Sequence, residues 1–177
     1  QEAQPSNVTL GGGPAEPVDL VIDGGIATII NGGDQQWLWM NQFTPGPLDL
    51  PFTLESVDIG FAPGNGGVSD GDLFDVYIWT DPDRDPTTGA DFVVSVTGEA
   101  ITPGVNFQTV TLPGGGVPIT VDSGDVLIGV VNRTSAATYA VAVADNPGTS
   151  QERSWAGLGF PGGVAGSPSE FGQPGFF

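Results

Sequence analysis

The chain has 177 residues, of which 21 are aspartate or glutamate and three are arginine, and its formal net charge is −18. So acidic a chain repels nucleic acid and anionic lipid, and therefore neither a nucleic-acid partner nor membrane insertion is expected. The sequence contains no histidine, cysteine or lysine, which excludes a histidine-dependent triad, a thiolate nucleophile and a Schiff base.

Glycine and proline divide the apolar part of the sequence into short segments. The 29 glycines and 16 prolines would favour disorder if apolar residues were scarce, but 38% of the chain is hydrophobic. Short β-rich runs between these residues predict many strands. We expect one domain over residues 18–177, preceded by an extension over residues 1–17. The chain starts with glutamine and has no long apolar run, which indicates a mature secreted protein, extracellular or on the cell surface.

The N-terminal extension contains one short segment with a β-pattern. Val8 and Leu10 alternate with Asn7 and Thr9, and a Gly-Gly-Gly-Pro stretch follows at residues 11–14. This pattern predicts a short strand on a flexible tether. Two interpretations stay open. The segment is either a frayed terminus, as most domains have, or a strand that self-associates by pairing with the sheet edge of another copy.

Residues 18–30 and 35–43 are predicted to form the two strands of a hairpin around the Asn-Gly-Gly-Asp sequence at residues 31–34. Trp37 and Trp39 lie two residues apart in the second strand and therefore share a face. Such a pair is either a platform for a sugar or, as large aromatic residues in β-sandwiches usually are, part of the core.

The stretch from Asp72 to Asp91 joins the most strongly patterned strand to an acidic loop. In the sequence F-D-V-Y-I-W at residues 74–79, the expected strand carries Phe74, Val76 and Ile78 on one face. It carries Tyr77 and Trp79 on the other face. Residues of β-branched and aromatic type in this arrangement predict a buried central strand.

Four closely spaced aspartates follow this strand: Asp81, Asp83, Asp85 and Asp91. Hard oxygen ligands gathered in one small volume suit calcium better than other common ions. The loop is no EF-hand, because Pro86 and Phe92 stand sixth and twelfth from Asp81, where an EF-hand has glycine and glutamate. We expect a structural Ca²⁺ site made by the four carboxylates and the backbone carbonyl of Thr87. The alternative is a solvated acidic turn, since aspartate and proline favour turns without any metal.

Further strands are predicted over residues 52–61, 92–96, 105–112, 119–121, 126–131, 139–144 and 153–155. The sequence V-L-I-G-V-V at residues 126–131 is apolar on both faces, so we expect it to lie centrally and to be covered on both sides. No segment of useful length has helical periodicity. These observations predict an all-β fold, an antiparallel two-sheet β-sandwich of jelly-roll type.

Three segments carry a resemblance to a known class of proteins: G-D-L-F-D-V-Y-I-W-T-D-P-D-R-D-P at residues 71–86, D-V-L-I-G-V-V-N-R at residues 125–133 and R-S-W at residues 153–155. The sequence is similar there to secreted bacterial β-sandwich domains of surface and extracellular-matrix proteins. The similarity covers most of residues 18–177, although Glu152 stands where that class often has glycine. It implies an architecture and a location rather than an activity.

Domains of that class tend to continue past an F-G-x-P-G segment, here residues 171–175, into one more apolar strand that closes the sheet. This sequence stops two residues after the segment. A sheet edge without its closing strand is an association site that must be covered, and the strand at residues 7–10 of another copy is the expected cover. Head-to-tail exchange makes an open filament when its rotation does not close. This logic resembles that of donor-strand-complemented fibres such as bacterial pilins, TasA-like matrix proteins and archaeal bundling pili.

Three classes of function fit the sequence unequally. The favoured one is a structural subunit of an extracellular filament or matrix, a homopolymer with a structural calcium site. The alternative is a secreted carbohydrate-binding or adhesive module, which shares the sandwich, binds polysaccharide and needs no donor strand. We do not expect an enzyme, because the carboxylates next to strand starts lie in turns that aspartate favours anyway. These carboxylates belong to Asp70, Asp72, Asp122 and Asp125.

Overall fold

A computed structural model describes residues 7–11, 18–21, 28–31, 37–46, 49–60, 69–85, 90–102, 107–112, 119–133, 140–144 and 154–158. Every regular element within these ranges is a β-strand, which confirms the prediction of an all-β chain. None of the described segments forms a helix long and apolar enough to cross a membrane.

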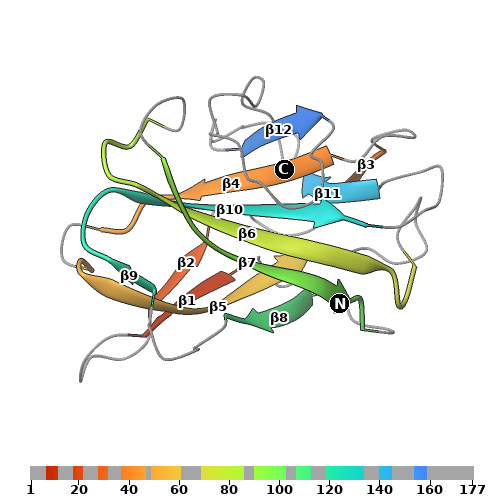
Figure 1. The fold of residues 1–177 in the computed structure, drawn as a ribbon, viewed down its shortest axis with the longest axis horizontal. Coiled ribbons are helices and arrows are strands. Elements are labelled where there is room, and N and C mark those ends of the chain that lie inside the picture. Colours follow the sequence, from red (N-terminus) through yellow and green to blue (C-terminus); the bar gives the residue numbers. More distant parts are fainter. Residues whose placement is uncertain are drawn as a thin grey trace.

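The described residues form twelve strands: β1 (Asn7–Gly11), β2 (Val18–Val21), β3 (Thr28–Asn31), β4 (Trp37–Phe43), β5 (Phe52–Gly60), β6 (Leu73–Asp81), β7 (Asp91–Ala100), β8 (Phe107–Thr111), β9 (Ile119–Val121), β10 (Asp125–Asn132), β11 (Ala140–Ala144) and β12 (Ser154–Leu158). They make two five-stranded sheets and a two-stranded one, drawn in Figure 1. All of their pairings are antiparallel, so the prediction of two antiparallel sheets is confirmed, and the pair β3–β11 is additional.

The first five-stranded sheet has the order β2-β1-β5-β8, and β9 also pairs with β5. In this sheet β1 lies between β2 and β5 and pairs with both, with Val8 opposite Val57 and Leu10 opposite Leu54. The alternating segment at residues 7–10 is therefore a strand, as its pattern predicts. In the single chain it is an inner strand of the chain's own sheet rather than a frayed end.

The second five-stranded sheet has the order β12-β4-β10-β6-β7, which places β10 in the middle (Figure 1). On one face of β10, Val126 and Ile128 are buried, and on the other face Leu127 and Val131 are buried. A strand that is apolar on both faces must be covered on both. The prediction that residues 126–131 lie centrally and are covered on both sides is therefore confirmed.

Two clusters of buried side chains flank this second sheet. The first combines residues of both five-stranded sheets, including Phe52, Leu54 and Val57 of β5 with Val76 and Ile78 of β6. The second lies on the opposite face of β6 and β10, because neighbouring residues of a strand point to opposite sides. Its members are Leu38, Met40, Tyr77, Trp79, Leu127 and Val131. The strand β11 contacts β10 and β4.

The hairpin predicted over residues 18–30 and 35–43 is wrong. The first of these ranges contains two strands that belong to different sheets, since β2 pairs with β1 and β3 pairs with β11. The strand β4 pairs with β10 and β12 instead. An Asn-Gly sequence favours a turn locally, but it does not determine which strand of a sheet becomes the partner. Trp37 and Trp39 lie in β4, and their side chains fall outside the described part of the structure.

Candidate cation site

Two aspartates face each other where β6 ends and β10 begins. Asp81 is the last residue of β6, Asp125 is the first residue of β10, and they are direct partners in the antiparallel ladder. Side chains of directly opposite residues lie on the same face at close range, where like charges are destabilising. Both aspartates are nevertheless buried, with 0% and 1% of their surface exposed.

Two tight turns create this arrangement. Gly124 precedes β10 and has a φ of 78°, a conformation that side chains other than glycine rarely adopt. On the other side Arg84 also has a positive φ, of 63°, and its amide donates to the carbonyl oxygen of Asp81 at 3.3 Å. The acidic loop therefore folds back over the end of β6 and lies against the turn that begins β10.

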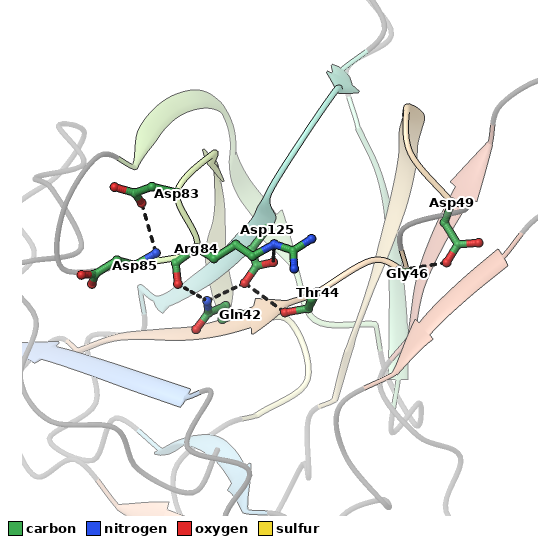
Figure 2. Close-up of polar contacts among 8 residues, drawn as sticks. All are labelled: Gln42, Thr44, Gly46, Asp49, Asp83, Arg84, Asp85 and Asp125. Carbon is green, nitrogen blue, oxygen red and sulfur yellow. Dashed lines mark hydrogen bonds and ion pairs between the residues drawn. The ribbon is translucent and has the colours of Figure 1, made fainter.

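The carboxylate of Asp125 is held on one side only. Gln42 Nε2 and Thr44 Oγ1, both from the end of β4, donate to Asp125 Oδ2 at 2.6 and 2.9 Å, as Figure 2 shows. Arg84 Nε lies 3.5 Å from Asp125 Oδ1, in an ion pair whose arginine side chain is 49% exposed. At that distance no hydrogen bond forms, and Oδ1 has no hydrogen-bond partner.

Asp81 has even fewer partners. Neither of its carboxylate oxygens accepts a hydrogen bond, although both are buried. Burial is the main cause that raises the pKa of the Asp81 carboxyl to about 7, and the neighbouring Asp83 carboxyl and the negative charges of Asp125 and Asp85 act in the same direction. The ionised Asp81 thus lacks any compensating donor among the described groups.

The remaining predicted ligands are placed less closely. Asp83 and Asp85 are exposed in the loop, and the amide of Asp85 donates to Asp83 Oδ1 at 3.1 Å (Figure 2). Asp91 is exposed at the start of β7, opposite Thr80. Thr87 lies outside the described residues. Within the described ranges no group of three or more carboxylates lies close enough to hold a metal ion without rearrangement.

Sequence reasoning missed Asp125, Gln42 and Thr44. The sequence D-S-G-D at residues 122–125 favours a turn by itself and therefore predicts that Asp125 is a turn residue. Its burial depends on the register between β6 and β10, which puts it opposite Asp81. The available signal was the charge at the first position of a strand that is otherwise apolar on both faces.

A second buried aspartate on the same face of β6 is fully satisfied. Asp75 accepts from Arg133 Nε at 2.5 Å, from the amide of Gly98 at 2.8 Å and from Tyr77 Oη at 3.2 Å. Burial is the main cause that raises the pKa of Tyr77, and the nearby Asp75 charge adds to it. This group joins β6 to β7 and to the end of β10. We call the group of Asp75, Tyr77, Gly98 and Arg133 the clasp. Both carboxylate oxygens of Asp75 have a donor within it.

Comparisons with protein-family models, with curated proteins and with solved structures give no match to this chain. Its function is therefore inferred from its own residues and contacts.

Proposed function

We propose that the chain is a structural subunit of an extracellular filament or matrix, built as a jelly-roll β-sandwich and joined to the next copy by its first strand. The observation that carries this proposal is the place of β1 in the first sheet. The strand is the first of the described strands along the chain, yet it lies inside the sheet between β2 and β5. Its main-chain pairing to β5 is a contact that the same strand of another copy can make equally well.

Exchange of β1 keeps the number of strand pairings constant. If β1 leaves its own sheet, the edge of β5 presents unpaired amide and carbonyl groups, which favour association with another strand. A second copy supplies the same sequence in the same register, with Thr9 opposite Ser56 and Leu10 opposite Leu54. The sequence between β1 and β2 starts with glycines at residues 12 and 13, which supply the conformational freedom that such an exchange requires.

The charge of the chain makes assembly depend on cations. Copies with a formal net charge of −18 repel one another in dilute salt. Calcium is the proposed structural cofactor, bound by the acidic loop with carboxylate oxygens and the carbonyl of Thr87. The carboxylates are those of Asp81, Asp83, Asp85 and Asp91. Calcium in this loop removes part of the repulsion and stabilises the end of β6.

Among the residues that the structure describes, no observation favours a carbohydrate-binding module. Tyr77 and Trp79, two of the three aromatic residues of β6, are each 1% exposed and pack against each other with ring centroids 6.1 Å apart. A sugar platform requires exposed aromatic faces. If the test of strand exchange fails, a polysaccharide-binding module is the alternative function.

A designed disulfide tests the exchange directly, because the natural sequence has no cysteine. Thr9 and Ser56 are opposite each other in the β1–β5 ladder, and directly opposite strand positions come close enough for a disulfide. In the variant with both Thr9→Cys and Ser56→Cys, oxidation of the assembled protein is expected to link successive copies into a ladder of covalent oligomers. Negative-stain imaging first shows that the sample contains filaments. The same sample should then give this ladder on a non-reducing gel.

The two single-cysteine variants are the controls, and they should give at most random dimers. Oxidised filaments that contain only monomers with an internal disulfide would refute strand exchange. A variant without residues 1–13 adds an independent measurement. It is expected to lose polymerisation and to regain strand pairing when a peptide of residues 1–13 is supplied.

A further inference from the structure

The oxygen atoms at the junction of β6 and β10 lack the donors that buried carboxylates need. Both oxygens of Asp81 and one oxygen of Asp125 are buried without a hydrogen-bond partner. Native proteins rarely leave buried polar atoms unpaired, and unpaired buried charges are more costly still. The three oxygens belong to residues that are opposite each other in one ladder, so they border one small volume.

Asp75 provides an internal comparison. It lies on the same strand and the same face as Asp81 and is almost equally buried, at 2% exposed. Its donors come from three places, namely Arg133, the Gly98 amide and Tyr77. The chain therefore supplies donors where a buried aspartate is purely structural. Asp81 receives none from the described residues, which points to a ligand from outside the chain.

We propose that Asp81 and Asp125 are the two inner ligands of a calcium site, and that the cation takes the place beside Asp125 which the guanidinium of Arg84 holds in this structure. This inference rests on the calcium loop proposed above and adds Asp125 to it. Asp83 and Asp85 lie on the loop that folds over the site, and they supply outer carboxylate oxygens when the loop closes on the ion.

The contacts around Asp125 suit such an exchange of cations. Gln42 and Thr44 hold Oδ2, so the free oxygen, Oδ1, is fixed in direction. Arg84 approaches Oδ1 only to 3.5 Å, and its side chain is half exposed. A long, half-exposed ion pair contributes little stability. Arg84 can therefore move into solvent when a stronger cation arrives.

The chemistry of the ligands favours calcium over other cations. The four aspartates offer carboxylate oxygens, and calcium accepts six to eight oxygen ligands in flexible geometry, whereas magnesium requires a near-ideal octahedron. No histidine or cysteine exists in the chain to select a softer metal. Four aspartates with one arginine leave a net negative charge around the site, which a divalent ion neutralises better than arginine alone.

Calcium titration of the purified full chain by calorimetry tests the inference, with folding of each variant checked by circular dichroism. Asp125→Asn and Asp81→Asn remove one charge each at nearly constant shape, and each should lower calcium affinity at least about tenfold, the scale found for groups that only support metal ligands. Glu55→Gln is the matched control, because it removes one charge at an exposed position of β5, outside the acidic loop. It should retain most of the affinity.

Arg84→Gln tests the exchange of cations and should raise the calcium affinity. In the Asp125→Asn background the same change should have little effect, because the arginine acts through Asp125. Calcium binding by Asp125→Asn as tight as that of the natural protein would overturn the inference and leave a site made by the loop alone. If Asp125→Asn fails to fold, an unchanged calcium affinity of Asp81→Asn would overturn the inference, because it requires both inner carboxylates.

Failure of the inference is distinguishable from failure of the proposed function. A natural protein that binds no calcium at millimolar concentration would overturn both calcium proposals, whereas strand exchange is measured separately by the disulfide between residues 9 and 56.

Discussion

Gly124 packs so closely against the end of β6 that a Cβ atom at this position would lie 2.1 Å from the carbonyl oxygen of Asp81. It would also lie 2.6 Å from the Cα atom of Pro82. Both neighbours are backbone atoms, which cannot move aside as the end of a side chain can. This contact therefore fixes the turn before β10 against the start of the acidic loop, and it brings Asp125 opposite Asp81.

Gly124→Ala is expected to destabilise the fold and to separate the two buried aspartates. The added methyl group meets backbone atoms, and the φ of 78° is unfavourable for alanine. Together these effects should lower the free energy of unfolding by clearly more than about 1 kcal/mol. Gly71→Ala is the matched control, because Gly71 has a similar φ of 85° but open space around the added Cβ. Equal losses in urea denaturation would contradict the role of the close approach.

Gly129→Ala tests the packing of the second cluster, which lies around the middle of β10. A Cβ atom at residue 129 would lie 2.7 Å from Leu38 Cδ1 and 3.0 Å from Trp79 Cζ3. Both side chains are almost fully buried, so the methyl group overpacks the site by about 1 to 3 kcal/mol. The loss should be smaller in a Leu38→Ala background, since that change vacates the space. If the stability losses of Gly129→Ala and Leu38→Ala simply add in thermal denaturation, the two positions do not share the same space.

The alternation of residues along β6 and β10 could be predicted, because their burial on both faces is a property of the strands themselves. Phe74 and Val76 lie in the first cluster and Tyr77 and Trp79 in the second, as period-two spacing requires. The strand β9 has the predicted bounds. Which strands pair could not be predicted in the same way, because side-chain period determines the face of a strand and not its neighbour.

The acidic loop and Asp125, the two parts of the candidate site, also differ in whether the sequence could predict them. The loop after β6 carries its own signal, since alternating aspartates are visible along the sequence. Asp125 became part of the site only through the ladder between β6 and β10, and the donors on it come from Gln42 and Thr44 at the end of β4. Three distant segments meet there. No local pattern predicts such a meeting, because it follows from the order of strands in the sheet.

Arg133→Gln should destabilise the clasp at the other end of β6. Arg133 is hydrogen-bonded and ion-paired to Asp75, which is buried, and the change leaves that carboxylate with fewer donors. We expect a loss of about 2 kcal/mol or more in the free energy of unfolding, since a buried charge without its partner is costly. The double variant with Asp75→Asn as well should recover part of the loss. Equal stability of the single variant and the natural protein would contradict the clasp.

The final prediction concerns the pH dependence of stability in the absence of divalent cations. Burial, helped by Asp83 and by the charges of Asp125 and Asp85, raises the pKa of Asp81 from its ordinary value of 3.8 to about 7. Arg84 is the nearby positive charge, and it is paired with Asp125. Between pH 3.8 and about 7 the folded chain binds the proton that the unfolded chain has released, so this group makes stability fall as the pH rises.

Asp81→Asn isolates this contribution, because asparagine does not ionise. In a chelating buffer the variant should match the natural protein near pH 4 and be more stable at pH 8, by at most roughly 4 kcal/mol, since each pKa unit corresponds to about 1.4 kcal/mol. Millimolar calcium should reverse the order at pH 8, because only the natural protein retains the charged inner ligand and gains stability from binding. Urea denaturation at both pH values, with chelator and with calcium, measures four free energies of unfolding for each protein. Parallel pH profiles of the two proteins in chelator would show that Asp81 is not the group that titrates.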